Sequence, residues 1–395
     1  MKTQNVKRLM FFLTIGLIGV TQARAQLNTS YGTLALYNTT SNGIYNAAFG
    51  NYALYFNTNG KYNTGIGFKA LYYNVIGNEN TAIGYYALLK NTNGVLNTAT
   101  GSNAMFNNDV GFSNSAYGVS SLYTNHHGNY NTASGVASMY NNYSGGYNTA
   151  SGYNALYTNS SGSYNTAMGT GALYGNTYGE SNTAVGAWAM RTNVIGFYNS
   201  GIGSYALYDL SGGGNNTAVG YNTGRGIVGG YGNTIIGANV TGLPSSLTNN
   251  IILADGNGNR RLQIDGNGKT RIGDPSLTTP GTYKLYVEDG ILTEKVVIAL
   301  ANSTQWADYV FAPDYKLMPL SEVAGFVKEN HHLPNVPAAE EVVKTGVDVA
   351  AMNAKLLEKI EELTLYLIDQ HQQHEALQKQ VADLKEKLAK LETGK

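Results

Sequence analysis

Small, polar and apolar residues recur in a fixed order along residues 46–237. The phrase Asn-Thr-Ala-x-Gly occurs twelve times, with small variations, at intervals of 17 residues. We number each unit from its Asn as position 1; position 5 is Gly in all twelve units and position 15 is Gly in eleven. Position 9 is Leu or Met in the first ten units. A fixed period this short indicates a quasi-one-dimensional protein in which each unit stacks on its neighbours.

A 17-residue unit is too short for a pair of helices, and its two Gly positions favour turns. We therefore expect a β-solenoid, or β-roll, with two short strands and two turns in each coil. The Gly residues would supply positive φ or allow close backbone approach. Leu and Met would form an inward apolar column, and the Asn column would stack as an amide ladder. Asn28 begins one earlier unit, and the register reaches Asn250, where Ile251 to Leu253 replace the motif as expected of a capping unit.

Position 10 is aromatic in eight of the first ten units and is the candidate binding face. Exposed rings at constant spacing can stack on sugars or pack on another protein. The alternative is that these rings cover the junctions between coils or a seam between chains. The candidate residues are Tyr55, Tyr72, Phe106, Tyr123, Tyr140, Tyr157, Tyr174 and Tyr208.

After the repeats the composition changes: residues 28–250 hold nine charged side chains, whereas residues 251–395 hold 37. We predict a solenoid over residues 26–254, a β-rich neck over 255–312, a small α+β cap over 313–347 and a coiled-coil helix over 348–395. Strand candidates in the neck are 285–287, 295–300 and 306–311. Asp-Gly-Asn-Gly at 255–258 and at 265–268 predicts turns rather than a calcium loop, because too few side-chain oxygens are present. A short helix should run from about Pro319 to Asn330, and Asp348 should cap the last helix.

The last segment carries apolar residues at alternating steps of four and three. This spacing predicts a coiled coil. The two polar members, Gln370 and His374, would fix register and oligomer state. The seam does not choose between two and three strands. Its residues are Leu356, Ile360, Leu363, Leu367, Gln370, His374, Leu377, Val381, Leu384, Leu388 and Leu391.

Two resemblances extend these predictions. The order of Asn, small residue, apolar residue and Gly over residues 28–254 resembles the head repeats of trimeric autotransporter adhesins, which implies a β-roll and a trimer. Asp308-Tyr309-Val310-Phe311, the run 314–323, His332-Leu333-Pro334 and the run 357–363 resemble the C-terminal region of secreted bacterial tail-fibre-domain proteins. That region is distantly similar to the intramolecular chaperone that trimerises phage tail fibres. Pro313 and Met318 stand where the chaperone's self-cleaving Ser–Lys dyad would be, so the resemblance implies no self-cleavage.

The N-terminus has the pattern of a secretory signal peptide over residues 1–25. Three basic residues precede an apolar run from Leu9 to Val20, and Ala23-Arg24-Ala25 is a cleavage site. Cleavage before Gln26 removes four basic residues and no acidic one, so the net charge falls from 0 to −4. We expect a secreted or cell-surface protein without a membrane span after cleavage. The chain has no Cys, which excludes disulfides and thiolate metal sites.

Several other classes of function are disfavoured. The few acidic residues of the repeats lie at different unit positions, so no carboxylate pair forms and we expect no enzyme and no catalytic residue. The His126-His127 and His331-His332 pairs lack further ligands, so we predict neither a metal nor a cofactor. No basic helix enters the coiled coil, which argues against nucleic acid as a partner. We expect an adhesive or structural fibre, with a homotrimer favoured and a surface glycan or protein as ligand. An ice- or glycan-binding solenoid using the Thr column is the alternative, and a glycan-active enzyme is a weaker one.

Overall fold

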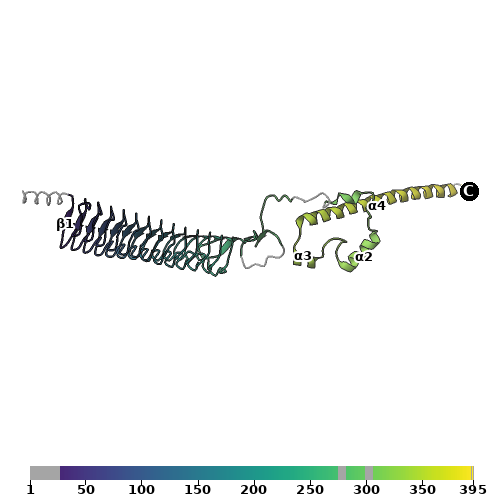
Figure 1. Ribbon diagram of the computed structural model, residues 1–395. Coiled ribbons are helices and arrows are strands. Elements are labelled where there is room, and N and C mark those ends of the chain that lie inside the picture. Colours follow the sequence, from purple (N-terminus) through teal and green to yellow (C-terminus); the bar gives the residue numbers. More distant parts are fainter. Residues whose placement is uncertain (1–26, 275–281, 299–305, 393, 395) are drawn as a thin grey trace, which may run out of the picture. The chain divides into compact units, whose positions relative to one another are not determined.

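A computed structural model of the chain describes residues 27–274, 282–298, 306–392 and 394 (Figure 1). The chain divides into two compact units, one ending at Gly290 and one beginning at Ile291. This division falls inside the predicted neck. The predicted signal peptide lies outside the described residues.

The first unit is a β-solenoid of 17-residue coils, as the sequence predicts. Each coil contributes one three-residue strand at positions 2–4, and the expectation of two strands per coil is wrong. The remaining positions form turns whose N–H groups donate to carbonyl oxygens of neighbouring coils, as Leu156 N–H does to Ala172 O at 2.9 Å. The strands of the first unit are β1 (Thr29–Tyr31), β2 (Ala47–Phe49), β3 (Thr64–Ile66), β4 (Thr81–Ile83), β5 (Thr98–Thr100), β6 (Ser115–Tyr117), β7 (Thr132–Ser134), β8 (Thr149–Ser151), β9 (Thr166–Met168), β10 (Thr183–Val185), β11 (Ser200–Ile202), β12 (Thr217–Val219), β13 (Thr234–Ile236), β14 (Ile251–Ala254), β15 (Arg260–Ile264), β16 (Thr270–Ile272) and β17 (Leu285–Val287).

Strands β1 to β14 pair in parallel, each residue opposite its counterpart in the next coil. Within each strand the side chain at position 3 points inward and is fully buried, for example Ala150. The Leu or Met at position 9 is also fully buried, so the two columns form one continuous core along the solenoid. The inward apolar column predicted from the repeat is therefore confirmed.

The Asn ladder at position 1 is also confirmed. The backbone N–H and the Nδ2 of Asn148 donate to Asn131 Oδ1 of the preceding coil, at 3.0 and 3.2 Å. Asn148 Nδ2 also donates to Gly162 O at 2.9 Å. These side chains are buried, and every coil repeats the arrangement, so each Asn satisfies backbone and side-chain groups that the core would otherwise leave unpaired.

A second Asn ladder runs at position 12, which the sequence analysis did not single out. Asn142 Nδ2 donates to Asn125 Oδ1 at 2.7 Å and to Gly145 O at 2.9 Å. The same Gly145 carbonyl accepts a bond from Asn131 Nδ2 at 2.8 Å, so it joins the two ladders. This ladder ends where Leu210 replaces Asn, and the buried Asn193 Oδ1 has no hydrogen-bond partner among the described residues.

The two Gly positions have different physical reasons. At position 5 the backbone has positive φ, +136° at Gly152, and a Cβ there would lie 2.7 Å from the carbonyl of Gly169. At position 15 a Cβ on Gly111 would lie 2.5 Å from amide atoms of both Asn108 and Asn125. Position 5 therefore requires Gly for its conformation and position 15 requires it for space between the ladders.

The C-terminal end of the solenoid is closed by an antiparallel hairpin. β14 pairs in parallel with β13 but antiparallel with β15, and β15 pairs antiparallel with β16. Gln263 on β15 donates to Asn250 Oδ1 at 2.9 Å, so it supplies the donor that a further coil would have provided. The two Asp-Gly-Asn-Gly segments form the turns between these strands; the Asp255 carboxylate accepts bonds from Asn257 N–H, Asn259 N–H and Arg261.

The second unit is helical. It contains a 3₁₀ helix η2 (Ala307–Phe311) and the helices α2 (Leu320–Asn330), α3 (Ala339–Thr345) and α4 (Val349–Glu392). A strand was predicted at 306–311, and this is wrong: the segment is η2, whose Ala307 and Val310 are buried. The predicted strand at 295–300 is not formed at 295–298, and its last two residues lie outside the described residues. Asp348 Oδ1 accepts the Ala351 N–H at 3.0 Å, so it caps α4 as predicted.

Candidate functional site

The predicted aromatic face at position 10 is a stacked column. The rings of Phe106, Tyr123, Tyr140, Tyr157 and Tyr174 follow one another with centroids 4.8–5.2 Å apart and nearly parallel planes. All eight candidate rings are half-buried. Where consecutive coils carry rings, each ring covers part of its neighbour's face. The column therefore covers the junctions between coils, as one of the two sequence-based interpretations expects, and leaves part of each ring exposed.

Two coils interrupt this column. Leu89 takes the position between Tyr72 and Phe106 and is buried. Arg191 takes the position between Tyr174 and Tyr208; its guanidinium carbon lies 5.6 Å from each ring centroid, and Nη1 donates to Tyr208 Oη at 2.9 Å. Tyr208 is therefore joined to the column by a cation–π contact with Arg191 rather than by stacking on another ring.

Burial shifts the pKa of the tyrosine hydroxyls in the middle of the column. Burial raises the pKa of the Tyr140 and Tyr157 hydroxyls, and the neighbouring Tyr hydroxyls add to the shift. These rings remain neutral hydroxyl donors throughout the physiological pH range.

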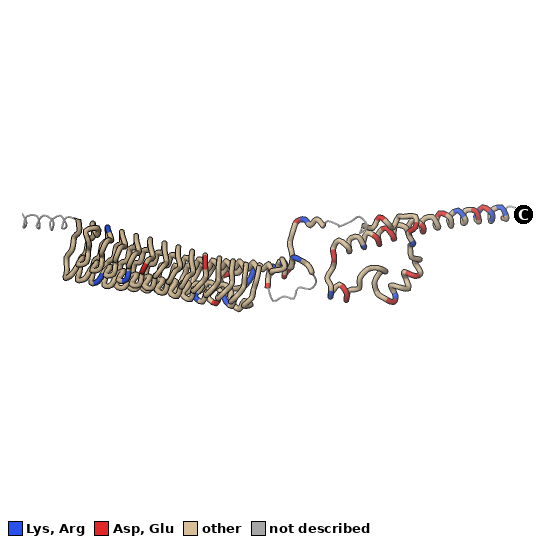
Figure 2. Tube along the Cα trace, in the orientation of Figure 1, with Lys and Arg blue, Asp and Glu red and all other residues tan. Residues whose placement is uncertain are grey.

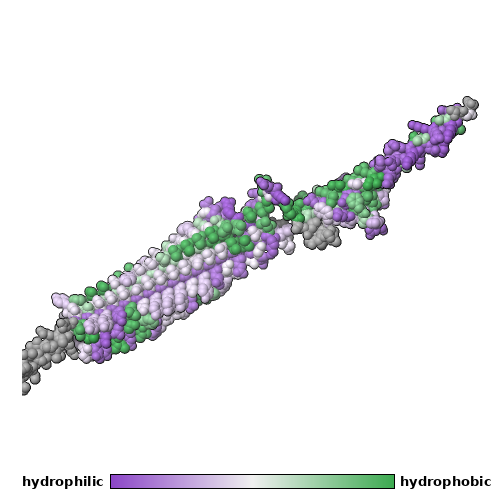
Figure 3. All heavy atoms as spheres, turned by 90° about the horizontal axis from the view of Figure 1, so that it is seen from above, coloured by the Kyte–Doolittle hydropathy of each residue, from purple (hydrophilic) through white to green (hydrophobic). Residues whose placement is uncertain are grey.

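A second and more exposed aromatic column lies at position 17, which the sequence analysis missed. Tyr130, Tyr147 and Tyr164 stack with centroids 4.8 and 5.0 Å apart, and their exposed fractions are 46–61%. A sequence signal was present, because Tyr directly precedes the position-1 Asn in several units. Figure 3 shows that side chains of similar hydropathy form rows along the solenoid.

The outer face of the strands carries the Thr column at position 2 and a mixed column at position 4. Position 4 is Ile83 in β4, Thr100 in β5, Tyr117 in β6 and Ser134 in β7. Because the position-4 side chains differ so much in size, the surface beside the Thr column is uneven. The flat Thr face that an ice-binding solenoid needs is therefore not formed along these coils.

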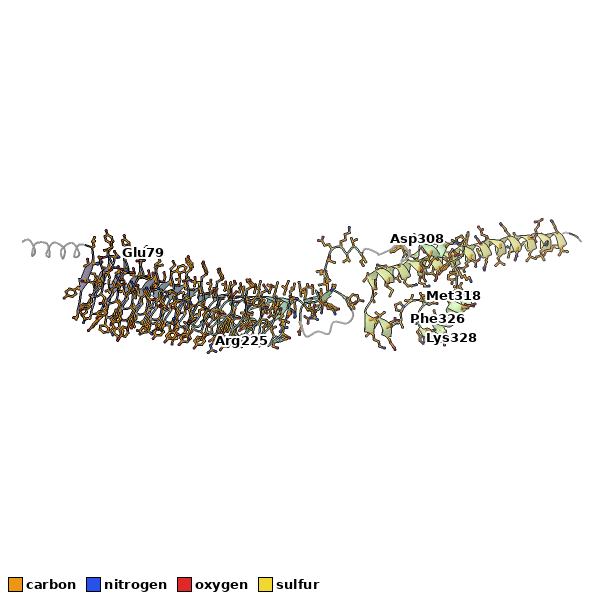
Figure 4. The ribbon with its side chains drawn as sticks, in the orientation of Figure 1. Glu79, Arg225, Asp308, Met318, Phe326 and Lys328 are labelled. Atoms are coloured by element: carbon orange, nitrogen blue, oxygen red, sulfur yellow. The ribbon has the colours of Figure 1, made fainter. Side chains whose placement is uncertain are left out.

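Near the C-terminal end of the solenoid one ion pair interrupts an otherwise sparsely charged surface. Arg225, labelled in Figure 4, has its Nε 2.7 Å from Asp209 Oδ2, and its guanidinium lies over the Tyr208 ring at 4.7 Å. Asp209 also accepts the Gly226 N–H at 2.9 Å. Burial opposes ionisation, but the bonds from Arg225 and Gly226 outweigh it and lower the pKa of Asp209. The pair links one coil to the next.

The predicted oligomerisation residues lie on α4, whose charged character is clear in Figure 2. Their apolar members are exposed, from 43% at Val381 to 77% at Leu391. Over the first part of the helix the opposite side is covered by its own unit, where Ala354, Glu358 and Glu361 are buried, whereas residues 367–392 are exposed on every side. The seam faces away from η2 in that first part, and Gln370 and His374 are exposed between its later apolar residues.

Polar contacts hold the covered side of α4. The Tyr309 hydroxyl donates to Glu358 and the Tyr315 hydroxyl donates to Glu362. Burial would raise the pKa of Glu358, but bonds from Lys355, Tyr309 and Lys359 lower it to about 2. The bond to Glu358, with burial, raises the pKa of Tyr309 to about 12. These groups are structural, because their hydrogen bonds are used within the unit.

Three further observations bear on function. Within the described part of the chain no group of three or more metal-ligating side chains gathers. Among the same residues no helix has the length and apolarity needed to cross a membrane. The chain matches no protein-family model, no curated protein and no solved structure.

Proposed function

We propose that this chain is a secreted or cell-surface fibre protein that assembles as a homotrimer and adheres through the repeated surface of its solenoid. The exposed seam of α4 is the observation that carries the proposal. Nine apolar side chains in heptad spacing are exposed on α4, whose first part is covered on the other side by its own unit and whose residues 367–392 are exposed on every side. Leaving such a stripe in water is unfavourable, and a parallel partner helix would bury it.

The rest of the second unit supports the need for a partner. Neither α2 nor α3 contains a single buried residue, and apolar side chains such as Leu320 and Val343 are exposed. Phe326 and Lys328 both project from α2 (Figure 4). A unit with so little core of its own is stabilised when copies share their apolar surfaces.

The solenoid supports the adhesive part. Its ladders and core place each surface residue at the spacing of neighbouring strands, about 4.8 Å. A ligand with several weak contacts gains affinity when three such surfaces are held together, because later contacts become intramolecular. The proposal includes a secretory signal at residues 1–25, supported by the basic, apolar and small-residue pattern there.

The oligomeric state tests the proposal. We expect light scattering of the chain from Gln26 to give three times the monomer mass. Leu377→Asp places a charge in the seam and should dissociate the assembly. Ala376→Asp places the same charge one residue away, outside the seam, and should leave it intact. A monomeric parent chain, or a Leu377→Asp variant as oligomeric as the control, contradicts the proposal.

A glycan-binding solenoid remains the second candidate, and it is compatible with the fibre. The half-exposed rings at positions 10 and 17 favour it, since aromatic faces and hydroxyls suit sugars. An ice-binding function has less support because of the uneven column beside Thr. A glycan-active enzyme has the least support, since the acidic side chains of the solenoid lie at different unit positions and form no pair.

A further inference from the structure

A groove on the solenoid crosses the four coils that begin at Asn63, Asn80, Asn97 and Asn114. It has a volume of about 430 Å³ and lies between the side chains at positions 11 and 13. Three coil spacings make it about 14 Å long. Its lining residues are Tyr73, Val75, Lys90, Thr92, Asn107, Asp109 and His126.

The floor of the groove is rigid. Position 12, between the two lining columns, holds the buried Asn ladder, here Asn74, Asn91 and Asn108. Asn91 Nδ2 donates to Asn74 Oδ1 at 2.7 Å and Asn108 Nδ2 to Asn91 Oδ1 at 2.8 Å. The lining side chains therefore start from backbone that is fixed before any ligand arrives, which lowers the entropic cost of binding.

One end of the groove offers an aromatic platform. The Tyr73 ring is 43% exposed and stacks on Phe56 with centroids 5.4 Å apart and planes 4° apart. This contact fixes one face of the ring and sets its orientation. A fixed, half-exposed ring presents an apolar surface next to a hydroxyl, and the C–H face of a sugar packs on such surfaces.

The middle of the groove gathers charged groups that are rare elsewhere on the solenoid. Lys90 and Asp109 are two of the nine charged residues among 28–250. Lys90 is exposed, and its Nζ lies 5.6 Å from the centroid of the Phe106 ring; it forms no ion pair with any described residue. Its ammonium group therefore retains donors for a ligand.

Asp109 is held in place by the preceding coil, through its main chain and its side chain. Its main-chain carbonyl accepts the N–H groups of Thr92, Asn93 and Gly94 at 3.1–3.3 Å. Its Oδ1 accepts the Thr92 hydroxyl. The remaining carboxylate lone pairs point to no described donor. His126 follows in the next coil, with its ring 4.9 Å from that of Tyr143.

We propose that this groove binds a short glycan segment, with Tyr73 stacking on one sugar ring and Lys90, Asn107 and Asp109 bonding to hydroxyls. Donors and acceptors of both signs lie beside an aromatic face, and this combination suits a polyhydroxylated ligand better than a polyanion or an apolar helix. The site deepens the adhesive function proposed above and rests on it, because one shallow groove binds weakly and a trimer presents three. It differs from the position-10 column in that it adds charged groups, those of Lys90 and Asp109, to an aromatic ring.

A printed array of neutral and acidic short oligosaccharides, probed with the labelled chain from Gln26, tests the groove. We expect binding to a restricted set of glycans. Tyr73→Ala, Lys90→Gln and Asp109→Asn should each weaken that binding by about tenfold, the effect of losing one good polar or stacking contact. Lys61→Gln, Glu79→Gln and Tyr153→Ala change exposed side chains of the same types outside the groove and should bind as the parent chain does.

Circular dichroism and light scattering of each variant separate lost binding from lost folding. The groove proposal is overturned if the chain binds no glycan on the array. It is also overturned if the chain binds and the groove variants bind as strongly as their controls. In the latter case another surface of the solenoid binds, and the adhesive function stands without the groove. A monomeric parent that still binds through the groove would refute the trimeric fibre and retain the site.

Discussion

Replacing one buried Asn of the position-12 ladder tests whether the ladders stabilise the solenoid. Asn142 and Asn141 are adjacent in one coil, and Asn142 is fully buried while Asn141 is exposed. Asn142→Ala removes the ladder amide, and Asn141→Ala removes an amide that lies in solvent. The two changes are otherwise identical in chemistry and position along the solenoid.

The number of hydrogen bonds lost sets the expected decrease in the free energy of unfolding. Asn142→Ala removes three hydrogen bonds: from its own Nδ2 to Asn125 Oδ1 and to Gly145 O, and from Asn159 Nδ2 to its Oδ1. Gly145 O keeps its bond from Asn131, but Asn125 Oδ1 becomes a buried acceptor with no partner. At about 1 kcal/mol net for each bond, the loss is about 3 kcal/mol, and the orphaned acceptor makes this a lower bound. Asn141→Ala should change stability by less than about 0.5 kcal/mol.

Native-state hydrogen exchange is the suitable measurement, because a solenoid can open coil by coil and a single unfolding midpoint can miss a local change. Amides in the coils beginning at Asn114, Asn131 and Asn148 should exchange faster by the factor that corresponds to about 3 kcal/mol. Amides near β12 should be unaffected. Equal exchange in the Asn142→Ala and Asn141→Ala variants would refute the role assigned to the ladder.

Three other outcomes are expected. Gly152→Ala forces a Cβ into positive φ and against Gly169, and should cost about 3 kcal/mol or more in thermal or urea unfolding, whereas Gly229→Ala meets no atom within 4 Å and should be nearly neutral. Glu358 has its pKa lowered from 4.5 to about 2, so its contribution to the packing of α4 is present above pH 4.5 and is lost as pH falls through about 2; acid titration followed by Tyr fluorescence should show this loss, and Glu358→Gln should remove it. Tyr309 has its pKa raised from 10 to about 12, so its contribution is present below pH 10 and is lost as pH rises through about 12; Tyr309→Phe should abolish that alkaline step in the same titration.

The sequence predicts the structure wherever the same residue type occupies the same position in every coil. The fixed spacing of Gly, Asn and Leu or Met predicts the solenoid, its core and its first ladder, because a repeat that must stack on itself repeats its chemistry. The second ladder at position 12 was predictable by the same logic, since Asn recurs there from Asn57 to Asn193. The exposed Tyr column at position 17 had a comparable signal.

Other features could not be read from residue types. Leu156 has φ +54° and Tyr147 has φ +58°, in the left-handed region that Leu and Tyr rarely adopt. The stacked coils impose this conformation, and burial of Leu156 offsets its cost. The single strand per coil follows from these turns. Segment 306–311 has the composition of a strand but forms η2, because this element packs on α4 rather than on a sheet and has Ala307 and Val310 buried.

The groove also could not be predicted from the sequence. Lys90 and Asp109 are 19 residues apart and occupy different unit positions, 11 and 13. Only the coil geometry places these positions on two sides of the buried Asn column. A repeat pattern identifies what each column shares, whereas a binding site made of different residue types in neighbouring coils interrupts that pattern.

The bond from Gln263 to Asn250 has a consequence for how far the protein can reach. Every coil makes the same position-1 amide bonds to its neighbours, and the last coil is closed by the hairpin. Removing or adding one whole 17-residue coil among those that carry Asn at position 12, from Asn57 to Asn193, therefore leaves both ladders continuous and each end intact, and changes the length by about 4.8 Å. The reach of the protein can vary in discrete steps through duplication or loss of single coils, with no new core chemistry at the joint.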